Sequence, residues 1–293
     1  MSKGIKWMSD REQLLLKSAR KLIYKTPEEG SELSIYLFLP KGLTEGPKCP
    51  VLLFFNSGAW DRGNVTQFAP QALYYVERGA VCGLVEYRNR SSHPGSSPTQ
   101  SLQDGRSAIR YIRLHAESLH IDGSRLAVVG AGAGANIAGG AAMRAQLPEP
   151  GIDKNQPDSQ PNASVLLSAI IDVNKGTYGF DQFANATDAR LASLTSHIDS
   201  GLPPMLLVHG TADRLVSHER IAEFAAKMER KKNPCEYVEF EGRDQHFFNL
   251  NVDPLSYEAC LGVMDAFLDR HGILKKSTNH EGPYLISWRE KDY

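Results

Sequence analysis

The stretch Leu126-Ala127-Val128-Val129-Gly130-Ala131-Gly132-Ala133-Gly134 decides the fold of this chain. Its first half is apolar, as is typical of a buried strand, and glycine then occupies three alternate positions. The small and apolar residues at 135–138 favour a helix. A strand that turns sharply into a helix presents the middle residue of the turn at the end of the strand, where a catalytic side chain can stand. That middle residue is Gly132, which has no side chain that can react.

The composition narrows the class of protein. With 293 residues, of which 41% are hydrophobic and 23% charged, the chain can bury a large core. The formal net charge is −1 and no long basic run occurs, so neither a nucleic acid nor an anionic membrane is expected as a partner. No apolar run is long enough to span a bilayer. Residues 1–6 lack the apolar core of a signal peptide, so we expect a cytoplasmic protein, or a secreted or periplasmic one if a signal was removed.

Strand and helix signals alternate along the chain, which predicts an α/β fold with a mostly parallel central sheet of about eight strands flanked by helices. Strands are expected at about 21–25, 33–39, 51–55, 80–87, 125–130, 164–171, 205–209 and 235–240. Helices are expected at 66–79, 103–119, from the turn to about 146, at 217–231 and at 255–272. The first two strands are expected to form an antiparallel hairpin.

We expect a single domain over residues 1–293, with its core at 20–275. Residues 147–161 predict a polar, proline-rich loop. Residues 172–203, which carry Gly, Asn and Thr, predict a short insertion that caps the site. Residues 276–293 form a C-terminal extension, either packed on the core or free to make contacts.

Two other segments follow strand signals and offer polar groups. Met205 to Gly210 reads as a buried strand, and the turn after it presents Asp213, a candidate catalytic acid. The loop after the strand at 235–240 carries His246, the only histidine in that segment and a candidate general base. Both come after Gly132 in the chain, in the order nucleophile, acid, histidine that such a site requires.

The expected pocket lies beside the turn. The segment after the strand at 51–55 is expected to supply backbone N–H groups that stabilise an oxyanion, and small residues there permit close approach. Its candidate pocket residues, with one from the turn itself, are Ser57, Gly58, Ala59, Trp60 and Ala133. The nine histidines and the four cysteines (Cys49, Cys82, Cys235 and Cys260) show no metal-ligand spacing, so neither a metal nor another cofactor is expected. Asp104 and Arg106 are expected to form a structural charge pair.

Taken together, these motifs make residues 20–275 similar to α/β-hydrolase carboxylesterases of the acetyl esterase/lipase type, near acetyl xylan esterases and feruloyl-esterase-like enzymes. The resemblance rests on Asn56 to Trp60, on 85–88, on the helix at 104–110, on Gly130 to Gly134, on 209–213 and on 240–249. It implies an α/β-hydrolase fold and a serine–acid–histidine site that hydrolyses small esters, with Asp213 at the position of the acid.

The chain departs from that family at the positions that carry out catalysis. The resemblance places the serine at Gly132 and the histidine at Gln245, so that His246 stands one residue late. Asn56-Ser57 also replaces the His-Gly pair of the family. The serine, the histidine and the oxyanion loop function only together. Their joint change therefore favours natural loss of the catalytic residues over deliberate replacement of the serine. Glycine suits the strained turn, since it adopts positive φ freely.

Two functions remain open. In the first, the chain is an esterase homologue without serine-hydrolase activity, whose pocket binds a carbohydrate or acyl ligand or a protein partner. In the second, it is an active ester hydrolase, such as a deacetylase of acetylated carbohydrate, or another enzyme that uses Asp213 and His246 to activate water. Ser57 lies near the pocket but has no identified base.

Overall fold

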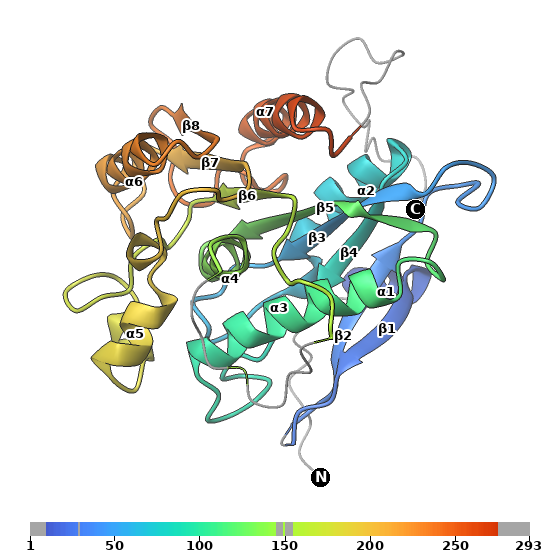
Figure 1. Ribbon diagram of the computed structural model, residues 1–293, viewed down its shortest axis with the longest axis horizontal. Coiled ribbons are helices and arrows are strands. Elements are labelled where there is room, and N and C mark those ends of the chain that lie inside the picture. Colours follow the sequence, from blue (N-terminus) through green and yellow to red (C-terminus); the bar gives the residue numbers. More distant parts are fainter. Residues whose placement is uncertain (1–9, 29, 145–148, 150–154, 275–293) are drawn as a thin grey trace.

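The structure is a computed structural model that describes residues 10–28, 30–144, 149 and 155–274 (Figure 1). Its strands are β1 (Arg20–Lys25), β2 (Leu33–Phe38), β3 (Cys49–Phe55), β4 (Val81–Val85), β5 (Ile121–Ala131), β6 (Ala163–Leu167), β7 (Met205–Gly210) and β8 (Cys235–Phe240). Its α-helices are α1 (Asp10–Ser18), α2 (Ala69–Glu77), α3 (Pro98–Leu114), α4 (Ala133–Ala142), α5 (Ala186–Ala192), α6 (His218–Arg230) and α7 (Pro254–Arg270). Short 3-10 helices are η1 (Val65–Phe68), η2 (Phe180–Gln182) and η3 (Leu194–Ser196).

The eight strands form one sheet in the order β1-β2-β4-β3-β5-β6-β7-β8. The antiparallel β1–β2 hairpin is confirmed, and β2 also runs antiparallel to β4. The pairs from β4 to β8 are all parallel. The carboxyl ends of β3, β5, β7 and β8 therefore lie along one edge of the sheet, where the segments with the candidate site residues begin.

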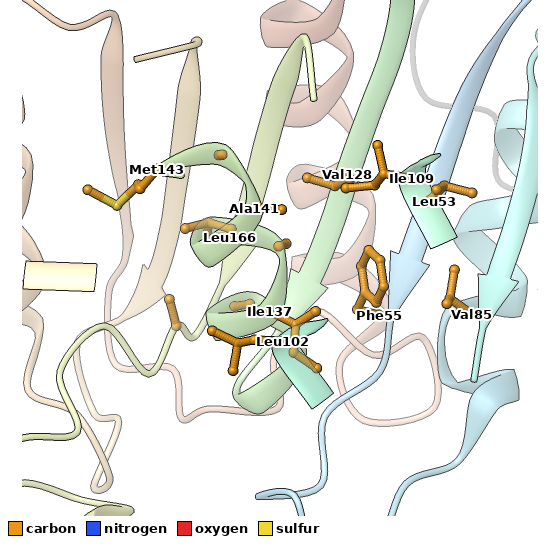
Figure 2. Packing of buried hydrophobic residues seen from close by; sticks show 14 of the residues in the cluster. Leu53, Phe55, Val85, Leu102, Ile109, Val128, Ile137, Ala141, Met143 and Leu166 are labelled. Carbon is orange, nitrogen blue, oxygen red and sulfur yellow. The ribbon is translucent and has the colours of Figure 1, made fainter. Parts of the chain in front are cut away.

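Helices cover both faces of the sheet, as the predicted α/β fold requires. On one face, side chains of the central strands pack against α3 and α4; Figure 2 shows Phe55, Val128 and Leu166 meeting Ile109 and Ile137. On the other face, Phe54 and neighbouring strand residues pack against α1, α2 and α7. Cys82 is buried in β4. Both faces of the central strands are buried, which explains their near-continuous apolar sequence.

Several element boundaries differ from those expected. The helix expected at 66–79 is η1 followed by α2, with Pro70 in the first turn of α2. The helix expected at 103–119 begins at Pro98, because Ser97 and Gln100 form a capping box there, and it ends at Leu114. The strand expected at 164–171 ends at Leu167, and the next residue, Ser168, has φ +44°. Helix α1 had no predicted counterpart.

The segment expected as a cap, 172–203, contains η2, α5 and η3. The Trp60 ring meets the Phe183 ring edge-on at 5.8 Å, and Asn136 Nδ2 donates to Ala192 O at 3.0 Å, so both the loop after β3 and helix α4 contact this segment. The extension at 276–293 and most of 145–154 lie outside the described residues. In the part of the chain that is described, no helix is long and apolar enough to cross a membrane.

Candidate active site

The turn between β5 and α4 has the geometry of a nucleophile elbow. Gly132 has φ +53° and ψ −114°, a conformation that side-chain-bearing residues rarely adopt. Its N–H donates to Leu167 O at 3.1 Å, and its carbonyl accepts from Asn136 N at 3.1 Å. The turn packs tightly, since a Cβ on Gly134 would lie 2.1 Å from Phe55 O. Ala133, the first residue of α4, is fully buried. The sharp strand-to-helix turn is therefore intact without its side chain.

The place of that missing side chain is open. A Cβ built on Gly132 would meet only Ser57 Cβ, at 3.5 Å, among described residues other than the chain neighbours of Gly132. A contact at 3.5 Å is ordinary van der Waals contact. The elbow therefore has room for a side chain, and Ser57 borders this space.

The segment after β3 forms a tight turn. Gly58, Ala59 and Trp60 all have positive φ, at +142°, +53° and +58°. A Cβ on Gly58 would lie 1.7 Å from Arg62 O, so only glycine fits at this position. Ser57 has both of its donors committed, because its N–H and its hydroxyl meet Gln67 Oε1 at 2.7 Å and 3.1 Å. The Ser57 N–H is thus not free to stabilise an oxyanion.

Asp213 faces a partner that sequence reasoning missed. Its Oδ2 lies 3.2 Å from Nε2 of His209, and both side chains are 1% exposed. Its Oδ1 accepts from the N–H groups of Leu215, at 2.8 Å, and Val216, at 3.2 Å. Burial lowers the pKa of His209, so its neutral form is favoured. The signal was present in the sequence, since His209 stands four residues before Asp213 at the end of a buried strand.

His246 lies on the surface. Its N–H donates to Asp244 Oδ1 at 2.7 Å, and its Nε2 lies 3.3 Å from Nε2 of the neighbouring Gln245. No hydrogen bond or ion pair joins His246 to Asp213 in the described structure. The geometry therefore brings Gly132 and Ser57 together, whereas it leaves the candidate acid and the candidate base with separate partners.

Two amides that the sequence reasoning also missed connect the elbow side to the histidine loop. Gln67 Nε2 donates to Asn249 Oδ1 at 3.1 Å, and Asn249 Nδ2 donates to His246 O at 2.9 Å. With the two bonds from Ser57 to Gln67, these form a continuous chain of neutral groups. We call Ser57, Gln67 and Asn249 the amide chain.

The expected Asp104–Arg106 pair is wrong. Asp104 is fully buried in α3 and binds Arg88, at 2.6 Å, and Lys25, at 2.8 Å, whereas Arg106 pairs with Glu149. Residues 104 and 106 lie on different faces of a helix, since neighbours on one face stand three or four residues apart. Both side chains are structural, as expected, but with other partners.

Comparison with known proteins agrees with this geometry. Residues 52–249 match the family model of the alpha/beta hydrolase fold, and the chain belongs to this family. Its sheet, elbow and flanking helices are those of an esterase-like member.

Among solved structures, the chain is similar to esterase 2 of Thermogutta terrifontis with propionate bound, at 31% identity and a TM-score of 0.83, over 89% of this chain and 97% of that one. Among curated proteins, it is similar to a probable isoprenylcysteine alpha-carbonyl methylesterase of Arabidopsis thaliana, at 27% identity over 71% of this chain and 47% of that protein. It is also similar to the esterase LipQ of Mycobacterium tuberculosis, at 24% identity over 68% of this chain and 50% of that protein. The chain thus spans half or less of the length of these two relatives.

Proposed function

We propose that this chain is an esterase-like α/β-hydrolase that does not hydrolyse esters by the serine route and that binds a small carbohydrate or acyl ligand at the elbow. The observation that carries the proposal is Gly132 in the elbow conformation, with an open position in place of the reacting hydroxyl. Covalent catalysis needs a nucleophile at that point, together with a base that takes its proton.

The surrounding groups support the same proposal. Asp213 accepts from two backbone N–H groups and lies near the neutral ring of buried His209, whose Nε2 bonds to Val216 O. Exposed His246 contacts Gln245. A general base requires hydrogen-bond reach to the proton that it removes and a partner that orients it. The Ser57 N–H is bound to Gln67, which removes one candidate donor from the oxyanion site.

The similar esterase of Thermogutta terrifontis has been solved with propionate and with butyrate bound. That esterase therefore binds carboxylates of three and four carbons. The elbow turn of this chain supports a ligand of similar size, which we assign to the open position beside Gly132.

Hydrolysis of p-nitrophenyl acetate tests the proposal, with the wild-type chain measured beside Asp213→Asn and His246→Ala. We expect the three rates to be equal and close to the uncatalysed rate, because no triad is assembled. Wild-type turnover that is lost in Asp213→Asn or in His246→Ala would overturn the proposal and favour the enzyme that activates water with this pair. Thermal unfolding of each variant verifies that a lost rate is not lost structure.

A further inference from the structure

The amide chain has one possible direction of hydrogen bonding. The backbone N–H of Ser57 can only donate, so the atom of Gln67 that it meets at 2.7 Å is the carbonyl oxygen Oε1. Gln67 Nε2 must then face Asn249, whose Oδ1 accepts at 3.1 Å. Asn249 Nδ2 in turn faces the carbonyl of His246, which only accepts. The orientation of both amides is therefore fixed by backbone groups at the two ends of the chain.

This direction determines what Ser57 can offer to a ligand. Its hydroxyl faces Gln67 Oε1, which has no proton, so the hydroxyl proton is committed to that bond. Ser57 Oγ keeps its lone pairs, and its Cβ borders the open position beside Gly132. At Ser57, a group held in that position therefore meets an acceptor and no spare donor.

We propose that the ligand places a hydroxyl group in the open position beside Gly132, where this hydroxyl donates a hydrogen bond to Ser57 Oγ. The ligand class is an alcohol or polyol, such as a sugar, and not a carboxylate. This inference rests on the proposed function, because it takes the elbow to be a binding site. The hydroxyl of the ligand then stands where an elbow serine would carry its own.

The amide chain favours a neutral group over an anion. Ser57, Gln67 and Asn249 carry no formal charge, so the amide chain offers no countercharge to a carboxylate. A carboxylate has only acceptor oxygens and would face the lone pairs of Ser57 Oγ. Leaving such a polar contact unpaired favours an alcohol over a carboxylate of equal length by about five-fold or more, which corresponds to about 1 kcal/mol or more.

The matched pair butan-1-ol and butyrate tests the proposal, since the two differ only at the terminal group. Saturation-transfer NMR is measured with the full-length wild-type protein and with Gly132→Ala, Ser57→Ala and Ser118→Ala. Ser118 is an exposed serine in the turn after α3, so its variant is the control. We expect transfer to butan-1-ol in the wild type and in Ser118→Ala. Transfer should be at least about two-fold weaker in Gly132→Ala, which fills the open position, and in Ser57→Ala, which removes the acceptor.

Stronger transfer to butyrate than to butan-1-ol would overturn the proposal, as would butan-1-ol binding that is unchanged in Gly132→Ala. Unfolding curves of the variants exclude loss of structure as the cause. The hydrolysis assay distinguishes failure of the hydroxyl proposal from failure of the proposed function. A protein that neither hydrolyses esters nor binds butan-1-ol refutes only the hydroxyl assignment, whereas turnover that depends on Asp213 refutes the proposed function itself.

Discussion

Gly132 holds its backbone at φ +53°, where a side chain has close contact with its own main chain. We predict that Gly132→Ala lowers the free energy of unfolding by about 1 kcal/mol, since alanine is strained at positive φ. Gly262→Ala in α7 is the control: a Cβ there meets no atom within 4 Å, and this exposed helical glycine has no positive φ. That variant should gain about 0.5–1 kcal/mol. Urea unfolding measures both, and a stabilised Gly132→Ala would contradict the assigned backbone strain.

His218, the first residue of α6, links this helix to β8. Its Nδ1 lies 3.2 Å from Glu239 Oε1 and its Nε2 lies 3.1 Å from Glu219 Oε1. The hydrogen bond that the His218 ring donates to Glu239 raises the pKa of His218, with further attraction from Glu219 and Glu241. A raised folded-state pKa stabilises the fold below the unfolded pKa of about 6.5, and this stabilisation is lost as pH rises through the folded pKa.

We therefore predict that Glu239→Gln lowers the pKa of His218 and reduces the loss of stability that occurs as pH rises from about 6.5 through the folded-state pKa. NMR titration of the His218 ring gives the pKa, and unfolding at several pH values gives the stability. An unchanged His218 titration in Glu239→Gln would show that Glu239 does not hold the charged imidazole.

At this scale, the sequence was sufficient to locate Gly132, Asp213 and the loop of His246, because each follows a strand of the parallel sheet and must lie near the end of it. Their partners could not be read in the same way. The contact between Asp213 and His209 depends on how the turn at 211–213 folds back on β7, and the contact between Ser57 and Gln67 depends on the position of η1. Such contacts follow from tertiary packing and have no fixed spacing in the chain.

At the scale of elements, one buried carboxylate joins three segments. Asp104 in α3 binds Lys25 of β1 and the side chain of Arg88, and its Oδ2 also accepts from Arg88 N at 3.0 Å. We predict that Asp104→Ala destabilises the protein by about 3–5 kcal/mol, because Arg88 then loses its partner in a buried place. Asp122→Ala, which removes a more exposed pair with Arg125, should cost about 1 kcal/mol or less. Urea unfolding measures the free energy of unfolding of the two variants. Equal losses would contradict the role of Asp104 as the carboxylate that joins three segments.

The elements themselves were predicted with mixed success, for physical reasons. The strand at 235–240 was expected within its observed bounds, since turn residues delimit it. The start of α3 was missed by five residues, because Thr99 to Gln103 are mostly polar and hydrophobic periodicity does not detect them, whereas the capping box at Ser97 does. Helix α1 is short and precedes the first strand, and its mixed sequence shows weak periodicity.

At the scale of the whole molecule, parallel strands deliver the parts of the site separately to one edge of the sheet. Gly132 follows β5, Ser57 follows β3, and the acid and histidine loops follow β7 and β8. Loss of function in one loop therefore leaves the other loops and the fold in place. On the proposed function, the same independence determines how many loops must change together before the chain hydrolyses esters by the serine route.

We predict that Gly132→Ser alone leaves hydrolysis of p-nitrophenyl acetate near the wild-type rate, because His246 is turned toward Gln245 and no base reaches the new hydroxyl. Gly132→Ser combined with Gln245→His places an imidazole at the position that the family resemblance assigns to the histidine. A positioned general base contributes about 10²–10⁴ in rate, so the double variant should exceed the single one by at least about 10²-fold. Adding Asp213→Asn should remove that gain if the carboxylate orients the new imidazole. Equal rates for Gly132→Ser and the double variant, both well above wild type, would instead assign the base to His246 and leave Gly132 as the only part of the catalytic site that has been lost.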